Sequence, residues 1–207
     1  MARLIDISPV ISSRIAVWPG DVSFSRTMSA SFANGANLDL SSITTTVHLG
    51  AHTDAPNHYH ADSEGIEERA LERYYGPCQV MTVAIPRGQR IQPVHLVGPV
   101  QAPRILFHTG TFPDPDNFNT DFAALSPELV AFLHDRGVQL VGLDTPSVDP
   151  CESKALESHN AIAERDMAIL EGVVLTGVED GLYTLIALPL RIEGADASPV
   201  RAILVTD

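Results

Sequence analysis

The sequence predicts an α/β fold. Its length of 207 residues fits one domain, or two small ones, and is sufficient to bury a full core. Short apolar segments that recur along the chain have the composition of strands. One well-capped helix is followed directly by a buried strand, and this helix-to-strand step is typical of mixed or parallel sheets.

The clearest element is a helix over residues 127–136. Ser126 can cap it, and Pro127 occupies the first turn, where no hydrogen-bond donor is lost. Leu129, Val130, Phe132 and Leu133 give the helix one apolar face, and Gly137 ends it. The segment 138–143 follows at once as a buried strand.

Local composition places the remaining elements. We expect a short helix at 66–71, irregular chain at 86–103, a loop at 112–119 and helix-compatible sequence at 152–167. Further strands are expected at 3–8, 43–47, 79–85, 105–108, 168–175, 183–190 and 200–205.

Charge and cysteine content exclude several classes of protein. The formal net charge is −13 and no basic stripe is visible, which argues against nucleic acid and anionic membranes as partners. Cys78 and Cys151 do not make a disulfide framework, so both thiols are expected to be reduced. No apolar run has the length of a membrane span, and the first residues lack a signal-peptide core. We therefore expect a cytoplasmic protein.

The segment from His48 to His58 reads His-Leu-Gly-Ala-His-Thr-Asp-Ala-Pro-Asn-His and holds three of the eight histidines. Imidazole together with a carboxylate suits a divalent metal such as zinc or manganese. The β-branched approach to His48 reads as a strand, but a straight strand would spread the ligands over roughly 20 Å, at ~3.3 Å per residue. The chain must therefore bend, and Gly50 has the greatest backbone freedom to allow it.

Polar residues elsewhere in the chain are candidates for the same site. Glu171 interrupts an apolar segment, where a carboxylate is costly unless it is paired or bound to metal, although an exposed edge or an ion pair would also explain it. His159 lies in a polar stretch that is also compatible with a solvated surface. Trp18 precedes a Pro-Gly turn and could be either a core anchor or a wall for an aromatic ligand. The loop 144–149 follows a buried strand, a common place for groups that face a ligand.

The chain resembles the metal-dependent cyclase and arylformamidase family, and within it the bacterial kynurenine formamidases. The resemblance rests on His48-x-Gly-x-His52-x-Asp54-x-Pro-x-His58 and extends from about Ile7 to Arg201. Ala51 stands where threonine is common in the family. Further matching segments are Trp18-Pro-Gly-Asp21, Asp144-Thr-Pro-Ser-x-Asp149, Glu152-Ser-Lys154, His159, Ile169-Leu-Glu171-Gly and Ala197-Ser-Pro-Val-Arg201.

This resemblance implies a compact single domain over 1–207, of mixed β-sheets with flanking helices in the cyclase-like, swivelling β/β/α manner, and a homodimer. It implies a site for two divalent ions, zinc before manganese. By position, His48, His52 and Asp54 would bind the first ion, while Asp54 and Glu171 would bridge and His159 would complete the second. His58 would act as the acid/base, and Trp18 would bind the substrate's aromatic ring.

The implied reaction is hydrolysis of N-formyl-L-kynurenine to L-kynurenine and formate, a step of tryptophan degradation through the kynurenine pathway. No Gly-x-Ser-x-Gly nucleophile elbow is present, which argues against an α/β-hydrolase. Two alternatives stay open: a related amide or lactam hydrolase that opens isatin, and a metal-binding protein without turnover. His60, His95, His108 and His134 are expected to have no part in the site, with His108 in the core and His134 exposed.

Overall fold

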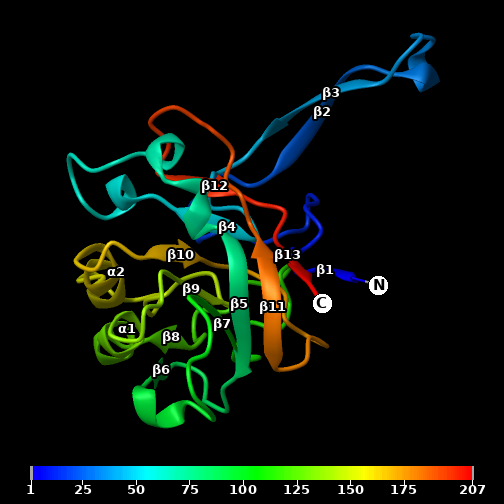
Figure 1. Ribbon diagram of the computed structural model, residues 1–207. Coiled ribbons are helices and arrows are strands. Elements are labelled where there is room, and N and C mark those ends of the chain that lie inside the picture. The colour runs from blue at the N-terminus through cyan, green and yellow to red at the C-terminus, as the bar shows by residue number, and fades with distance from the viewer. Residues whose placement is uncertain (1, 207) are drawn as a thin grey trace.

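A computed structural model describes residues 2–206 and confirms the mixed α/β architecture (Figure 1). Within these residues, a seven-stranded sheet has the order β1-β13-β11-β5-β7-β9-β10. Strands β5, β7, β9 and β10 run parallel, whereas β11, β13 and β1 are antiparallel to their neighbours. The bounds are β1 (Leu4–Asp6), β5 (Tyr75–Thr82), β7 (Arg104–His108), β9 (Leu140–Leu143), β10 (Ala168–Leu170), β11 (Gly181–Ile186) and β13 (Ile203–Val205).

Three small strand pairs and a few helices complete the fold. The pairs join β2 (Ser25–Ala30) to β3 (Leu40–Thr44), β4 (His52–Asp54) to β12 (Ala197–Pro199), and β6 (Arg90–Ile91) to β8 (Ala124–Leu125). The helices are α1 (Pro127–His134), α2 (Glu157–Ala163) and the 3₁₀ turns η1 (Phe32–Asn34), η2 (Pro56–His58), η3 (Ile66–Glu68), η4 (Leu71–Arg73) and η5 (Pro93–His95).

Helix α1 begins where the sequence predicts. The Ser126 side chain accepts a hydrogen bond from the backbone N–H of Leu129, and Pro127 occupies the first position. Gly137 follows with φ of +80°, a left-handed conformation that glycine adopts without strain. This geometry returns the chain directly into β9.

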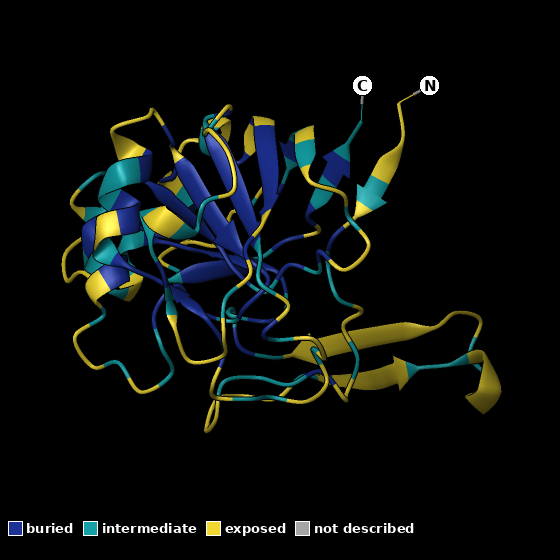
Figure 2. Cartoon of the chain, turned by 90° about the horizontal axis from the view of Figure 1, so that it is seen from below, coloured by how far each residue is buried: buried dark blue, intermediate teal, exposed yellow. Residues whose placement is uncertain are grey.

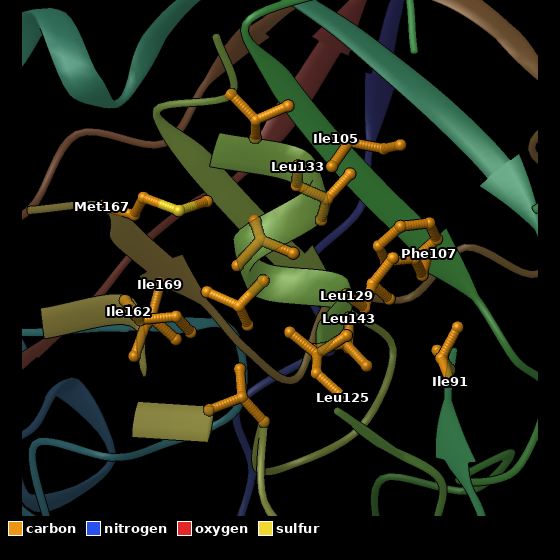
Figure 3. Packing of buried hydrophobic residues seen from close by; sticks show 14 of the residues in the cluster. Ile91, Ile105, Phe107, Leu125, Leu129, Leu133, Leu143, Ile162, Met167 and Ile169 are labelled. Carbon is orange, nitrogen blue, oxygen red and sulfur yellow. The ribbon is translucent and has the colours of Figure 1, made fainter. Parts of the chain in front are cut away.

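Alternating side chains of the sheet supply two buried layers. On β7, Ile105 and Phe107 face α1 and α2, whereas Leu106 lies in the layer on the opposite face. Figure 3 shows Leu129 and Leu133 of α1 packed toward Ile105 and Phe107. Burial of apolar surface on both faces explains why the parallel strands read as nearly continuous hydrophobic runs.

The β2–β3 hairpin differs from the rest of the chain in burial. It extends away from the main sheet (Figure 1) and is exposed along its length (Figure 2). Several of its side chains are nevertheless apolar, among them Met28, Phe32, Leu40 and Ile43. The hairpin therefore presents apolar surface that this chain does not cover itself.

Some predicted boundaries were wrong. The strand expected at 168–175 ends at Leu170, because Gly172 turns the chain with φ of +65°. The helix expected at 66–71 is two separate 3₁₀ turns, η3 and η4. The strand expected at 43–47 ends at Thr44, and the one expected at 79–85 begins already at Tyr75. His108 is only half-buried at the end of β7 and is not a core residue, while His134 is exposed as predicted.

Two further expectations concern thiols and membranes. Cys78 and Cys151 are both free, as predicted. Among residues 2–206, no helix combines the length and apolar character needed to cross a membrane.

Candidate metal centre

The histidine motif meets the distant Glu171 through backbone pairing. The N–H of His52 donates to the carbonyl of Glu171 at 3.1 Å, and the N–H of Glu171 donates to the carbonyl of His52 at 2.9 Å. Strand β4 thus lies against the end of β10, with β12 paired on its other edge (Figure 1). This arrangement brings two segments separated by more than a hundred residues to one point.

Two glycines allow this close approach. Gly50 has φ of +57°, which confirms the bend that the motif requires, and Gly172 has φ of +65°. A Cβ atom on Gly172 would lie 2.2 Å from the carbonyl oxygen of Gly50, closer than any side chain tolerates. Only a chain without Cβ at this point lets the histidine loop lie against the turn that carries Glu171.

Asp54 lies at the centre of the site. Its side chain is 1% exposed, and three imidazole nitrogens surround it: Nδ1 of His48 at 3.1 Å, Nε2 of His52 at 3.5 Å and Nε2 of His159 at 3.5 Å. Neither carboxylate oxygen accepts a well-formed hydrogen bond from residues 2–206. A buried carboxylate without hydrogen bonds is costly, whereas metal coordination would satisfy it, so these residues fit a divalent ion.

The floor of the site consists of His52, His159 and Glu171, whose side chains are 3%, 4% and 3% exposed. His52 Nδ1 lies 2.9 Å from the carbonyl oxygen of Gly50, to which it can donate. This contact leaves Nε2 of His52 facing Glu171 Oε2 at 3.2 Å. The other oxygen of Glu171 accepts a 2.6 Å hydrogen bond from the backbone N–H of Val148.

A buried aspartate orients His159. Asp149 Oδ2 lies 2.8 Å from His159 Nδ1, which leaves Nε2 directed toward Asp54. The backbone N–H groups of Ser158 and His159, at the start of α2, also donate to Asp149, and Arg90 donates to its other oxygen at 2.8 Å. A carboxylate behind a histidine is the usual arrangement for a metal ligand, because it fixes the tautomer and the ring orientation.

The rim of the site consists of His48, His58 and Asp196. His48 and His58 are 17% and 35% exposed, and their ring centroids lie 4.2 Å apart. Asp196 Oδ2 lies 2.9 Å from His48 Nε2 and 3.4 Å from His58 Nδ1. Both rim histidines therefore contact the same carboxylate oxygen.

The clustered carboxylates shift the pKa values of the site histidines. Burial lowers the pKa of His48, but Asp54 and Asp196 outweigh that effect and raise its pKa to about 9. Burial likewise lowers the pKa of His159, but Asp149 and Asp54 raise it to about 10. Burial raises the pKa of Asp54, but the neighbouring His159 and His48 hold it well below its usual range. Carboxylates at this spacing stabilise positive charge on the neighbouring groups.

Donor atoms gather in two overlapping groups, each with its members within 4.8 Å of one another. His48, Asp54 and His58 make one group, and His52, Asp54 and Glu171 make the other. Asp54 belongs to both, as a bridging ligand would. All six residues named by the sequence motif and its distant partners thus lie together, with His159 reaching the site through Asp54 and Glu171.

A cavity of about 470 Å³ opens onto these groups, and it has the size of a small-molecule site. Trp18, Phe112 and Phe118 are among its lining residues, with Trp18 and Phe118 packed edge to face at 5.5 Å. His58, His159 and Glu171 line the same cavity. These three aromatic residues, here called the aromatic wall, therefore share one cavity with the candidate metal ligands.

Sequence reasoning missed the roles of Asp149, Arg90 and Asp196. Asp149 was recognisable as part of the polar loop after a buried strand, but its partner was not. Asp196 directly precedes the family-like segment that begins at Ala197 but is not part of it. Arg90 lies in an irregular stretch and gave no signal.

The chain is similar in sequence to proteins of known family. Residues 5–150 match the family model described as "Putative cyclase". A kynurenine formamidase of Bordetella petrii is 44% identical over 206 residues, covering 99% of this chain and 98% of that protein. One of Delftia acidovorans is 42% identical, covering 98% and 97%.

Solved structures share the fold. A potential metal-dependent hydrolase with cyclase activity superposes with a TM-score of 0.84 at 24% identity, covering 100% of this chain and 99% of that one. Isatin hydrolase A from Labrenzia aggregata superposes with a TM-score of 0.83 at 20% identity, covering 99% and 94%.

Proposed function

We infer the function from the premise that this chain belongs to the cyclase family. We propose that it is a metal-dependent arylformamidase that hydrolyses N-formyl-L-kynurenine to L-kynurenine and formate, a step in tryptophan degradation. Identity of 42–44% to kynurenine formamidases, over nearly the whole of both chains, supports this substrate. The observation that carries the chemistry is the buried Asp54, shared by two groups of metal-binding side chains.

Two divalent ions, zinc before manganese, fit the ligands. His48, His52 and Asp54 would hold the first ion, and Asp54, Glu171 and His159 the second. The mixture of imidazole and carboxylate is typical of zinc and manganese sites. When bound, the ions would supply Lewis-acid chemistry, which polarises a carbonyl oxygen and acidifies a water molecule.

His58 is suited to move the proton. It is the most exposed of the site histidines and lines the cavity, so a substrate can reach it. His58 takes a proton from the water that attacks the formyl carbon and gives it to the aniline nitrogen as the carbon–nitrogen bond breaks. Imidazole serves both steps because its ordinary pKa lies near neutrality.

The aromatic wall would position the substrate. Trp18, Phe112 and Phe118 can pack against the aniline ring, and this packing would hold the formyl group toward His58 and Glu171, which line the same cavity. Such positioning raises the rate of the chemical step, because the reacting groups are already held in the geometry that the reaction needs. The aromatic wall would also favour the binding of flat aromatic substrates over that of aliphatic amides.

The assay that tests this function measures kcat/KM of the zinc-loaded protein for N-formyl-L-kynurenine and for isatin, side by side. We expect N-formyl-L-kynurenine to be the better substrate by at least about a hundredfold, equivalent to about 2.7 kcal/mol. A preference for isatin would assign the chain to lactam hydrolysis instead. Bound zinc without turnover of either compound would favour a metal-binding protein.

The exposed β2–β3 hairpin supports a homodimer. Phe32 and Ile43 are 65% and 64% exposed, and a second copy of the chain would cover such residues. Sedimentation at micromolar concentration should give the mass of two chains, and a monomer would contradict this. The two free thiols fit a reducing compartment, so we place the enzyme in the cytoplasm.

A further inference from the structure

Asp196 joins two histidines that the proposed mechanism gives different tasks. A single oxygen, Oδ2, lies 2.9 Å from Nε2 of His48 and 3.4 Å from Nδ1 of His58. Among residues 2–206, Asp196 supplies the only carboxylate within 4.0 Å of the His58 ring nitrogens. The sequence separates Asp196 from His48 by 148 positions, so the fold alone creates this contact.

The backbone around Asp196 is fixed independently of its side chain. Its carbonyl accepts a 2.8 Å hydrogen bond from the N–H of Ala55, and the next residue, Ala197, pairs with Asp54 between β12 and β4. The carboxylate is therefore held beside the histidines by the same strand pair that carries a central ligand. Removal of the carboxylate would leave this backbone pairing intact.

The contact with His48 determines which nitrogen faces the centre. Because Nε2 of His48 contacts Asp196, Nδ1 remains directed toward Asp54 Oδ1 at 3.1 Å. In this role Asp196 resembles Asp149, which lies behind His159 on the floor. A carboxylate behind a ligand histidine fixes its ring and raises its basicity.

The contact with His58 fixes the other rim histidine. His58 is the last residue of the 3₁₀ turn η2, its side chain is 35% exposed, and the floor provides it with no hydrogen bond. With Nδ1 3.4 Å from Asp196, the ring lies beside that of His48, tilted by 45° from it, and Nε2 makes no hydrogen bond with residues 2–206. A free Nε2 is what the proposed proton transfer needs.

We propose that Asp196 is a positioning residue that orients His48 for metal binding and holds His58 in place as the acid/base. This inference rests on the proposed function for the role of His58, but its part concerning His48 does not need a substrate. On the rim, the single carboxylate of Asp196 contacts both histidines, whereas each histidine of the floor has its own partner.

The test compares Asp196→Ala and Asp196→Asn with wild type. Zinc affinity is measured by competition with a chromophoric chelator, and we expect Asp196→Ala to weaken it by about tenfold to a hundredfold. Asp196→Asn, which keeps one acceptor oxygen, should fall between wild type and the alanine variant. At saturating zinc, kcat should fall while KM for N-formyl-L-kynurenine stays unchanged, because Asp196 acts through His58 and not on the substrate.

Asp135→Ala is the matched control. It also removes an exposed aspartate that lies near a histidine, His134, but outside the site, so zinc affinity and kcat should equal those of wild type. Melting temperatures check that each variant folds, and the nearly isosteric asparagine variant keeps the test valid if the alanine variant does not.

The outcomes separate this inference from the proposed function. Unchanged zinc affinity and unchanged kcat in a folded Asp196→Asn and Asp196→Ala pair would overturn the positioning role. A parallel rise in KM would overturn it as well, because Asp196 would then contact the substrate. If wild type failed to hydrolyse N-formyl-L-kynurenine while Asp196→Ala still weakened zinc binding, the proposed substrate would fail and the role toward His48 would stand.

Discussion

The floor and the rim of the site hold their histidines by different means. His52 and His159 are 3% and 4% exposed, and each has its own partner, the carbonyl of Gly50 or the carboxylate of Asp149. His48 and His58 are 17% and 35% exposed and share Asp196, which is itself 48% exposed. Burial makes the floor suited to permanent ligands, whereas exposure makes the rim suited to meet substrate.

The largest effect should come from the floor. Glu171→Ala removes a carboxylate that faces His52, so we expect less than two equivalents of zinc per chain by elemental analysis. Turnover should fall by roughly a thousandfold, equivalent to about 4 kcal/mol of transition-state stabilisation. Glu179→Ala, on the exposed surface, is the control. Two equivalents of zinc retained in Glu171→Ala would remove Glu171 from the ligand set.

The rim should respond differently. His58→Ala should keep its zinc but lose at least about a hundredfold in kcat, which is the usual contribution of a general acid/base. Zinc content and kcat are measured on the same preparation, with His134→Ala as the control. Zinc lost together with turnover would make His58 a ligand, consistent with its closeness to His48 and Asp54.

Acidity should weaken zinc binding because protons compete for the same nitrogens. The pKa of His48 is raised to about 9 and that of His159 to about 10, so both carry a proton at pH 7 that zinc must displace. Zinc affinity should therefore rise with pH, by about tenfold per unit for each proton displaced below these pKa values. Competition titrations from pH 6 to pH 8 measure the slope, and a flat profile would show that neither histidine is a ligand.

The smallest effect should come from the partner behind the floor. Asp149→Asn keeps an acceptor for His159 but loses the negative charge, so zinc affinity should weaken by about tenfold, the lower end for such partners. Asp144→Asn changes another buried aspartate of the same loop, which accepts from Thr109 and Gly110 and not from a ligand, and should leave zinc affinity unchanged. Equal effects of the two variants would mean that loop damage, not the contact with His159, weakens the site.

The sequence predicted local features better than distant ones. The capped start of α1 and the bend at Gly50 depend on neighbouring residues, and the structure has both. The strand through Glu171 was predicted too long, because the close contact between Gly172 and Gly50 involves segments far apart in the chain. Asp196 was missed for the same reason, since only strand pairing brings it to His48 and His58.

In the proposed reaction, residues of the floor and rim would hold the metal ions that the hydrolysis of N-formyl-L-kynurenine requires. The most direct test strips the protein with a chelator, confirms the loss of metal by elemental analysis, and follows kynurenine release as zinc is added back. We predict that turnover disappears on stripping and rises with added zinc until two equivalents per chain are bound. Full turnover by protein shown to hold no metal would contradict the account.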